Sequence, residues 1–166
     1  MVYEAFLGGH VLSAVTIARQ MLSRGHEPVF VGKEGRMTPI IEQEMKFEKL
    51  DIPVFHGDRP TYFTWDSWQA VTDLRRIIRT NSIDLIHTFD ARSYFHCHPA
   101  ATMENIPIVG TLCGGTDPTY NLPRAPKIMV FSEEQKAKMV ESFKWKPERV
   151  DVIRTRLDLQ LSLIHI

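Results

Sequence analysis

The chain has 166 residues, 43% of them hydrophobic and 24% charged, and its 20 lysines and arginines balance 20 aspartates and glutamates. This length predicts one domain with its own core, and the zero net charge argues against a nucleic-acid-binding protein, which needs a basic surface. Two cysteines make a poor disulfide framework, which suits a reducing compartment. No apolar run reaches the roughly 20 residues of a membrane span, and the first residues do not resemble a secretion signal. We therefore expect a cytoplasmic protein.

The expected strands and helices alternate along the chain, which is typical of a parallel sheet with helices on both faces. Turn residues and apolar runs predict strands at residues 2–7, 28–32, 47–55, 83–88, 107–112, 127–131 and 150–153. Helices are expected at residues 10–24, 35–44, 65–80 and 91–104 and after Ser132. The sequence therefore predicts one three-layer α/β/α domain with a mostly parallel sheet.

Local signals mark where several of these helices begin and end. Gly25 is expected to end the first helix with a positive φ, and Thr64 and Ser132 are expected N-caps. The helix that starts after Thr64 and ends near Asn81 is predicted to have one buried and one solvated face. The expected buried residues are Trp68, Val71, Leu74 and Ile78, and the expected exposed ones are Arg75, Arg76 and Arg79.

The last six residues, 161–166, read Leu-Ser-Leu-Ile-His-Ile and resemble the translation of a sequencing-library adapter. We therefore assign residues 1–160 to the domain and residues 161–166 to a non-native tail, with a native apolar tail as the alternative. On this interpretation the natural protein continues beyond Gln160.

Three loops at the expected carboxyl ends of strands carry the candidate site, because ligands of doubly wound sheets bind there. The first is Gly8-Gly9-His10, where glycines and a helix N-terminus would admit a phosphate; a tight turn without a ligand explains the same residues. The dinucleotide pattern Gly-x-Gly-x-x-Gly is absent.

The second and third loops carry polar groups suited to a sugar or a phosphate. Asp90 and Arg92 would orient hydroxyls or bind phosphate, although Asp90 also suits a helix N-cap. The third loop holds Cys113, Gly114, Gly115 and Asp117, of which the aspartate also suits a turn before Pro118.

Two further groups of residues are weaker candidates. His96, Cys97 and His98 lack zinc-type spacing, and helix neighbours two residues apart face different ways, so we expect no metal site. Trp65, Trp68 and the arginines beside them would suit a membrane surface, although a solvated helix face is the commoner explanation.

Taken in order, these pieces resemble the retaining glycosyltransferases of family four, which are built from two facing Rossmann-like domains. The resemblance covers residues 7–158. It rests on the glycine turn, the Arg-Gly-His-Glu turn at 24–27, the Ile-Asp-Leu-Ile-His strand at 83–87, the Ile-Pro-Ile-Val strand at 106–109, the Val-Phe-Ser-Glu junction at 130–133 and the Glu-Arg-Val-Asp-Val-Ile segment at 148–153.

The resemblance implies the acceptor-side half of a hexosyltransferase that takes part in carbohydrate biosynthesis. The co-substrate would be a nucleotide sugar, without a metal or other cofactor, and a C-terminal domain outside this chain would bind most of it. Gly8, Gly9 and His10 would face the donor diphosphate. The acceptor, a carbohydrate or a lipid-linked sugar, would by position face Asp90, Arg92, Cys113, Gly114, Gly115 and Asp117. Peripheral contact with a membrane is a further expectation left open. This fragment alone is expected to be inactive.

The sequence departs from the family pattern at positions that often hold histidine, since Phe89 and Cys113 stand there instead. We therefore assign no catalytic residue, and we expect His87 to pack in the core beneath the loops. Two alternatives stay open: half of a sugar-nucleotide epimerase, which can share this architecture, and a non-catalytic ligand-binding domain of flavodoxin-like type.

Overall fold

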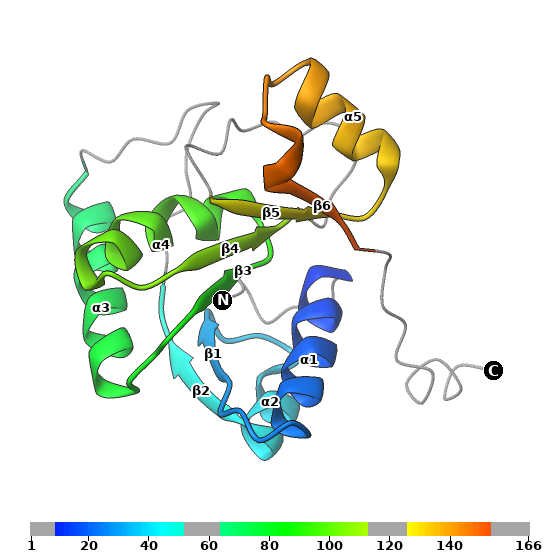
Figure 1. Ribbon diagram of the computed structural model, residues 1–166. Helices are drawn as coiled ribbons and strands as arrows, with labels where there is room; N and C mark the ends of the chain where they lie inside the picture. The colour runs from blue at the N-terminus through cyan, green and yellow to red at the C-terminus, as the bar shows by residue number, and fades with distance from the viewer. Residues whose placement is uncertain (1–8, 52–63, 113–125, 154–166) are drawn as a thin grey trace.

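The computed structural model describes residues 9–51, 64–112 and 126–153, and Figure 1 shows helices and strands alternating along them. The helices are α1 (Gly9–Leu22), α2 (Thr38–Glu44), α3 (Trp65–Thr80), α4 (Ala91–Glu104) and α5 (Glu133–Glu141), with a 3-10 turn at Pro147–Arg149. The strands are β1 (Val29–Gly32), β2 (Lys46–Lys49), β3 (Ile86–Thr88), β4 (Ile108–Thr111), β5 (Lys127–Val130) and β6 (Val150–Val152). The expected strand at residues 2–7 lies outside the described residues.

Every strand pair of the described residues is parallel. One sheet pairs β1 with β2, and the other has the order β3-β4-β5-β6, so that within each sheet every strand lies beside the next one in the chain. Parallel neighbours need crossover connections, and α2, α4 and α5 supply those of β1 to β2, β3 to β4 and β5 to β6. The predicted α/β class with a parallel sheet is confirmed.

Helices cover both faces of the strands (Figure 1), and the two core clusters show that neighbouring strand residues face opposite helix layers. In β1, Val31 belongs to the core formed with α3, α4 and α5, whereas Phe30 belongs to the core formed with α1 and α2. In the same way Ile86 of β3 faces α3, and Phe89, just after β3, faces α1. β1 and β3 therefore lie in one layer between the same two layers of helices, although no pair joins them.

The predicted helix caps are confirmed. The side-chain oxygens of Thr64, Asp90 and Ser132 each accept a hydrogen bond from the backbone N–H three residues later. Gly25 has a φ of +83°, as expected for the residue that ends α1. Each cap supplies an acceptor for a backbone N–H that would otherwise lack one in the first helical turn.

The buried face of α3 differs from the prediction at one position. Trp68 is 50% exposed, whereas Ile77 is 4% exposed and takes part in the core. The buried stripe of α3 begins at Ser67, one residue before Trp68. Because successive helix residues are rotated by about 100°, Trp68 lies at the edge of this stripe.

The expected arginine face of α3 is only partly solvated. Glu104 of α4 accepts hydrogen bonds from Arg75 at 2.6 Å and Arg79 at 2.7 Å, and Arg75 is half-buried. Arg79 and then Arg75 lower the pKa of Glu104 by these hydrogen bonds. The two arginines thus hold α3 against α4.

Candidate functional site

The start of α1 lies beside the end of β3. Val11 and Val15 of α1 are buried in the same core cluster as Phe89, the residue that follows β3. Gly9 and His10 open α1, and Asp90 follows Phe89. The structure therefore brings the described part of the glycine turn and Asp90 to the same edge of the sheet.

Gly9 leaves room for a ligand at this edge. A Cβ atom built on Gly9 meets no atom within 4 Å, and the residue is exposed. It opens a helix of 14 residues that has no acidic residue in its first turn. Free N–H groups and the positive end of the helix dipole are the features that bind phosphates at helix N-termini.

Asp90 caps α4 with both carboxylate oxygens. Its Oδ1 accepts the backbone N–H of Ser93 at 2.8 Å, and its Oδ2 accepts the Ser93 hydroxyl at 2.6 Å. Ser93 is fully buried. The capping role that the sequence suggested for Asp90 is thus confirmed, and any contact of Asp90 with an acceptor is additional to it.

The other predicted members of the site lie outside what the structure describes. They are Gly8, the side chain of Arg92, and the loop residues Cys113, Gly114, Gly115 and Asp117. Their assignment remains a prediction.

His87 lies below this edge and joins two strands. Its Nε2 shares a hydrogen bond of 2.7 Å with the Thr111 hydroxyl, which ties β3 to the end of β4. Its ring stacks on Phe89 with centroids 4.2 Å apart. Phe89, where many family members have histidine, is 4% exposed and packs against α1. His87 is half-buried and lines a cavity, and the loop with Cys113 beneath which it was expected to pack lies outside the described residues.

The residues His96, Cys97 and His98 lie on different sides of α4. His96 and Cys97 are fully buried, and the His98 ring lies 5.6 Å from the Tyr94 ring. Burial raises the pKa of the Cys97 thiol to about 12. A thiol in that state is a core residue, because nucleophiles and metal ligands require the thiolate.

A second group at the same edge was missed by the sequence reasoning. Figure 1 shows β1 pointing the same way as β3, so the turn after β1 leaves the edge that carries Gly9. This turn presents exposed Lys33 and Arg36 and is closed by a 2.9 Å hydrogen bond from the Gly35 N–H to the Thr38 hydroxyl. The available signal was the pair of cationic residues directly after an apolar strand.

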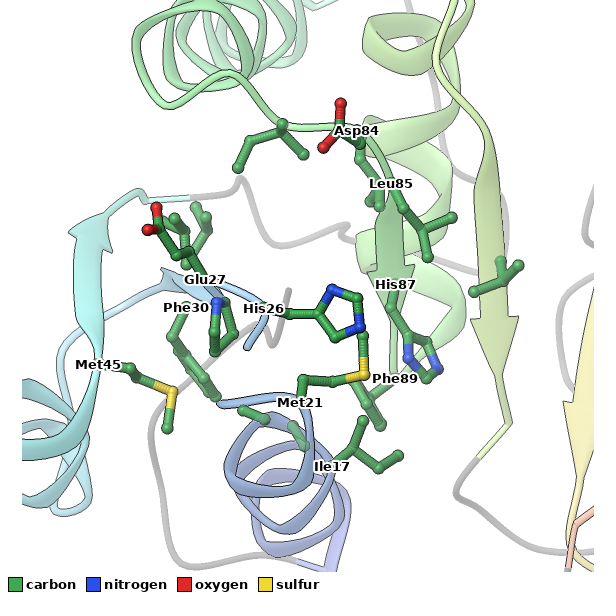
Figure 2. Close-up of a pocket in the computed structure, with 18 of the residues that line it drawn as sticks. Ile17, Met21, His26, Glu27, Phe30, Met45, Asp84, Leu85, His87 and Phe89 are labelled. Carbon is green, nitrogen blue, oxygen red and sulfur yellow. The ribbon is translucent and has the colours of Figure 1, made fainter. Parts of the chain in front are cut away.

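A large cavity lies among the described residues, next to this edge. A space of about 840 Å³ runs between β1 and β3, with residues of both helix layers along it. In Figure 2, His87 of β3 and Phe30 of β1 lie on opposite sides of the cavity, and Met21 and Ile17 of α1 lie between them. Gly9, His10 and Asp90 do not line it. The cavity nevertheless reaches the carboxyl ends of β3, β4 and β5, since Phe89, Thr111 and Phe131 line it.

At the start of α3, Trp65 is 81% exposed and Trp68 50% exposed. In the described ranges, each helix is too short or too polar to cross a membrane.

Comparison with known proteins gives this arrangement a family. The sequence profile described as Glycosyltransferase Family 4 matches residues 7–161. Over 107 residues the chain is 27% identical to the UDP-N-acetylglucosamine–N-acetylmuramyl-(pentapeptide) pyrophosphoryl-undecaprenol N-acetylglucosamine transferase of Neisseria meningitidis serogroup C, covering 61% of this chain and 30% of that protein.

Solved structures agree in fold. A glycosyltransferase from Rickettsia africae matches 98% of this chain and 47% of its own, with a TM-score of 0.73 and 16% identity. Anabaena Alr3699/HepE, solved with UDP and glucose, matches 96% of this chain and 45% of its own, with a TM-score of 0.69 and 17% identity. The chain thus spans less than half the length of each, and it belongs to Glycosyltransferase Family 4.

Proposed function

We propose that this chain is the acceptor-side half of a hexosyltransferase that moves a sugar from a nucleotide-sugar donor to an acceptor with retention. The observation that carries the proposal is the open position at Gly9, at the start of α1 and on the same edge as Asp90. Family membership and a relative named as an N-acetylglucosamine transferase support the reaction type.

The chemistry follows from this edge. As the glycosidic bond to the donor breaks, negative charge develops on the leaving diphosphate, and preorganised N–H dipoles stabilise such charge. Gly8, Gly9 and His10 would supply these dipoles at the start of α1, and a second lobe would bind the rest of the nucleotide. The proposal includes no metal or other cofactor.

The acceptor would lie against the neighbouring loops. We assign it to Asp90, Arg92 and the loop with Cys113, Gly114, Gly115 and Asp117, whose polar groups and glycines suit sugar hydroxyls. An acceptor linked to a lipid would bring the protein to the cytoplasmic face of a membrane, where exposed Trp65 and Trp68 suit the interface.

The test measures release of UDP from UDP-N-acetylglucosamine by a chain that carries this domain together with a second nucleotide-binding lobe. Release that depends on an added lipid-linked or carbohydrate acceptor supports the proposal. Interconversion of the sugar without an acceptor would mark an epimerase, and nucleotide-sugar binding without turnover would mark a binding module. The isolated 166-residue chain is expected to show no turnover.

Replacing Gly9 by valine tests the role of the turn. The added side chain enters open space, so the fold is expected to stay intact while the diphosphate is obstructed. We expect turnover to fall about 100-fold, the effect of losing a donor to a developing negative charge. Gln20→Val, at an exposed position of α1, is the matched control. Unchanged turnover in Gly9→Val would remove the diphosphate role of the turn.

A further inference from the structure

A cationic turn, residues 33–36, lies at the edge of the sheet where α1 begins. The residue after it, Met37, is 6% exposed and belongs to the same buried cluster as Val11 and Phe89. Val11 is in the first turn of α1, and Phe89 is the residue that follows β3. The start of α1, the end of β3 and this turn therefore meet over one cluster.

Hydrogen bonds and a buried base fix this turn. The Gly35 N–H donates to the Thr38 hydroxyl at 2.9 Å, and the Thr38 N–H donates to the Gly35 carbonyl at 3.0 Å. Thr38 is 8% exposed, whereas Arg36, between the two, is an exposed residue. The turn thus presents Arg36 at the rim on a preformed backbone, which lowers the entropy cost of binding a ligand there.

Arg36 is the cation of this turn that lacks an acidic neighbour. Lys33 has its Nζ atom 4.0 Å from a carboxylate oxygen of Asp51. Glu34 accepts a hydrogen bond from Lys49 at 2.8 Å. Among the residues that the structure describes, none forms a hydrogen bond or an ion pair with the Arg36 guanidinium. A guanidinium matches phosphate oxygens with two parallel N–H donors, so an exposed arginine at a phosphate-binding edge has a clear use.

We propose that Arg36 binds a phosphate group of the substrate. The inference rests on the proposed function, in which a diphosphate lies against Gly9 and His10 at the same edge. The N–H groups of a helix start carry only partial charge, and the guanidinium beside them supplies a full positive charge. The phosphate belongs either to the diphosphate of the donor or to a phosphate-linked acceptor, and both offer the same oxygen atoms to an arginine.

Titration of inorganic pyrophosphate into the isotope-labelled chain at constant ionic strength, followed by NMR, tests the contact. The Arg36 Nε–H signal is expected to move. Arg36→Gln should weaken pyrophosphate binding about tenfold or more, the effect of losing a hydrogen bond between charged groups. Arg24→Gln is the matched control, because Arg24 is also exposed and lies beyond the opposite end of α1. The control removes the same charge and should leave the affinity unchanged.

The same titration separates this inference from the proposed function. An Arg36 signal that does not move would overturn the contact, as would equal weakening by Arg36→Gln and Arg24→Gln. The backbone N–H signal of Gly9 reports the glycine turn. A shift at Gly9 without one at Arg36 would overturn the contact alone, and a shift at Arg36 without one at Gly9 would support the contact and count against the role of the glycine turn.

Steady-state kinetics of the chain with a second nucleotide-binding lobe distinguish the two sources of the phosphate. If the phosphate is the donor's, Arg36→Gln should raise KM for UDP-N-acetylglucosamine about tenfold. If it is the acceptor's, KM should rise for a polyprenyl-pyrophosphate-linked sugar and stay unchanged for the same sugar without phosphate. Arg36→Lys keeps the charge and loses the second donor of the fork, so it should recover part of the affinity. An unchanged KM for both substrates in Arg36→Gln would overturn the inference.

Discussion

Replacing Asp90 by alanine should destabilise the protein by two separable losses. The backbone N–H of Ser93 loses its cap, which costs about 0.5–2 kcal/mol. The fully buried Ser93 hydroxyl loses its acceptor at 2.6 Å, which costs about 1–3 kcal/mol. We expect a total of about 1.5–5 kcal/mol, which corresponds to a fall in Tm of about 3–20 °C for a chain of this size.

Urea unfolding followed by far-UV circular dichroism measures this loss. Asp90→Asn keeps a capping oxygen for the Ser93 N–H, and its amide can donate to the Ser93 hydroxyl, so it should cost less than Asp90→Ala. Ser93→Ala removes the buried hydroxyl, so the double variant Asp90→Ala/Ser93→Ala should lose less than the sum of the two single variants. Equal stability of the Ala and Asn variants would refute the reasoning.

Three further predictions concern the core and the contact between α3 and α4. Gly110→Val should destabilise by about 1–3 kcal/mol in urea unfolding, because a Cβ there already lies 3.3 Å from the Tyr94 ring; an unchanged midpoint would contradict this packing. Iodoacetamide should leave Cys97 unmodified in the native protein and label it only in urea, as read by peptide mass spectrometry, since burial raises the pKa of its thiol; rapid native labelling would contradict its burial. Glu104→Gln should lower the free energy of unfolding at pH 7, because Arg79 and Arg75 lower the pKa of Glu104 in the folded state. That stabilisation is present above the unfolded-state pKa of about 4.3 and is lost as the pH falls through the lower folded-state pKa. The difference in unfolding free energy between Glu104→Gln and the wild type should therefore shrink in acid. A difference that stays constant with pH would contradict the assignment.

Local signals in the sequence predicted the helix ends well. Thr64, Asp90 and Ser132 cap their helices because a short side-chain oxygen before a helix has one dominant use, and α4 runs from Ala91 to Glu104 as predicted. The strands are shorter than predicted: β3 begins at Ile86 and not at Ile83, since apolar residues leading into a strand look the same in sequence as paired ones.

Properties that depend on tertiary contacts were harder to predict. Trp68 lies at the edge of the α3 stripe, and only packing against α4 and the sheet decides which edge residues are covered. Glu104 binds Arg75 and Arg79, residues more than 20 positions away in the chain, so no local pattern marks the contact. At the candidate edge, Asp90 was predicted from its position after a strand, whereas the place of Lys33 and Arg36 at the same edge needed the direction of β1.

The order of the strands also bears on how the chain folds during synthesis. Partners in the four described pairs, such as Val29 with Lys46 and Ile86 with Ile108, lie about 20 residues apart in the sequence. Each strand can therefore pair as soon as the next crossover has left the ribosome, without waiting for the C-terminus. Such short loops favour rapid folding, and translation at about 5–20 residues per second would let each new strand find its neighbour in turn.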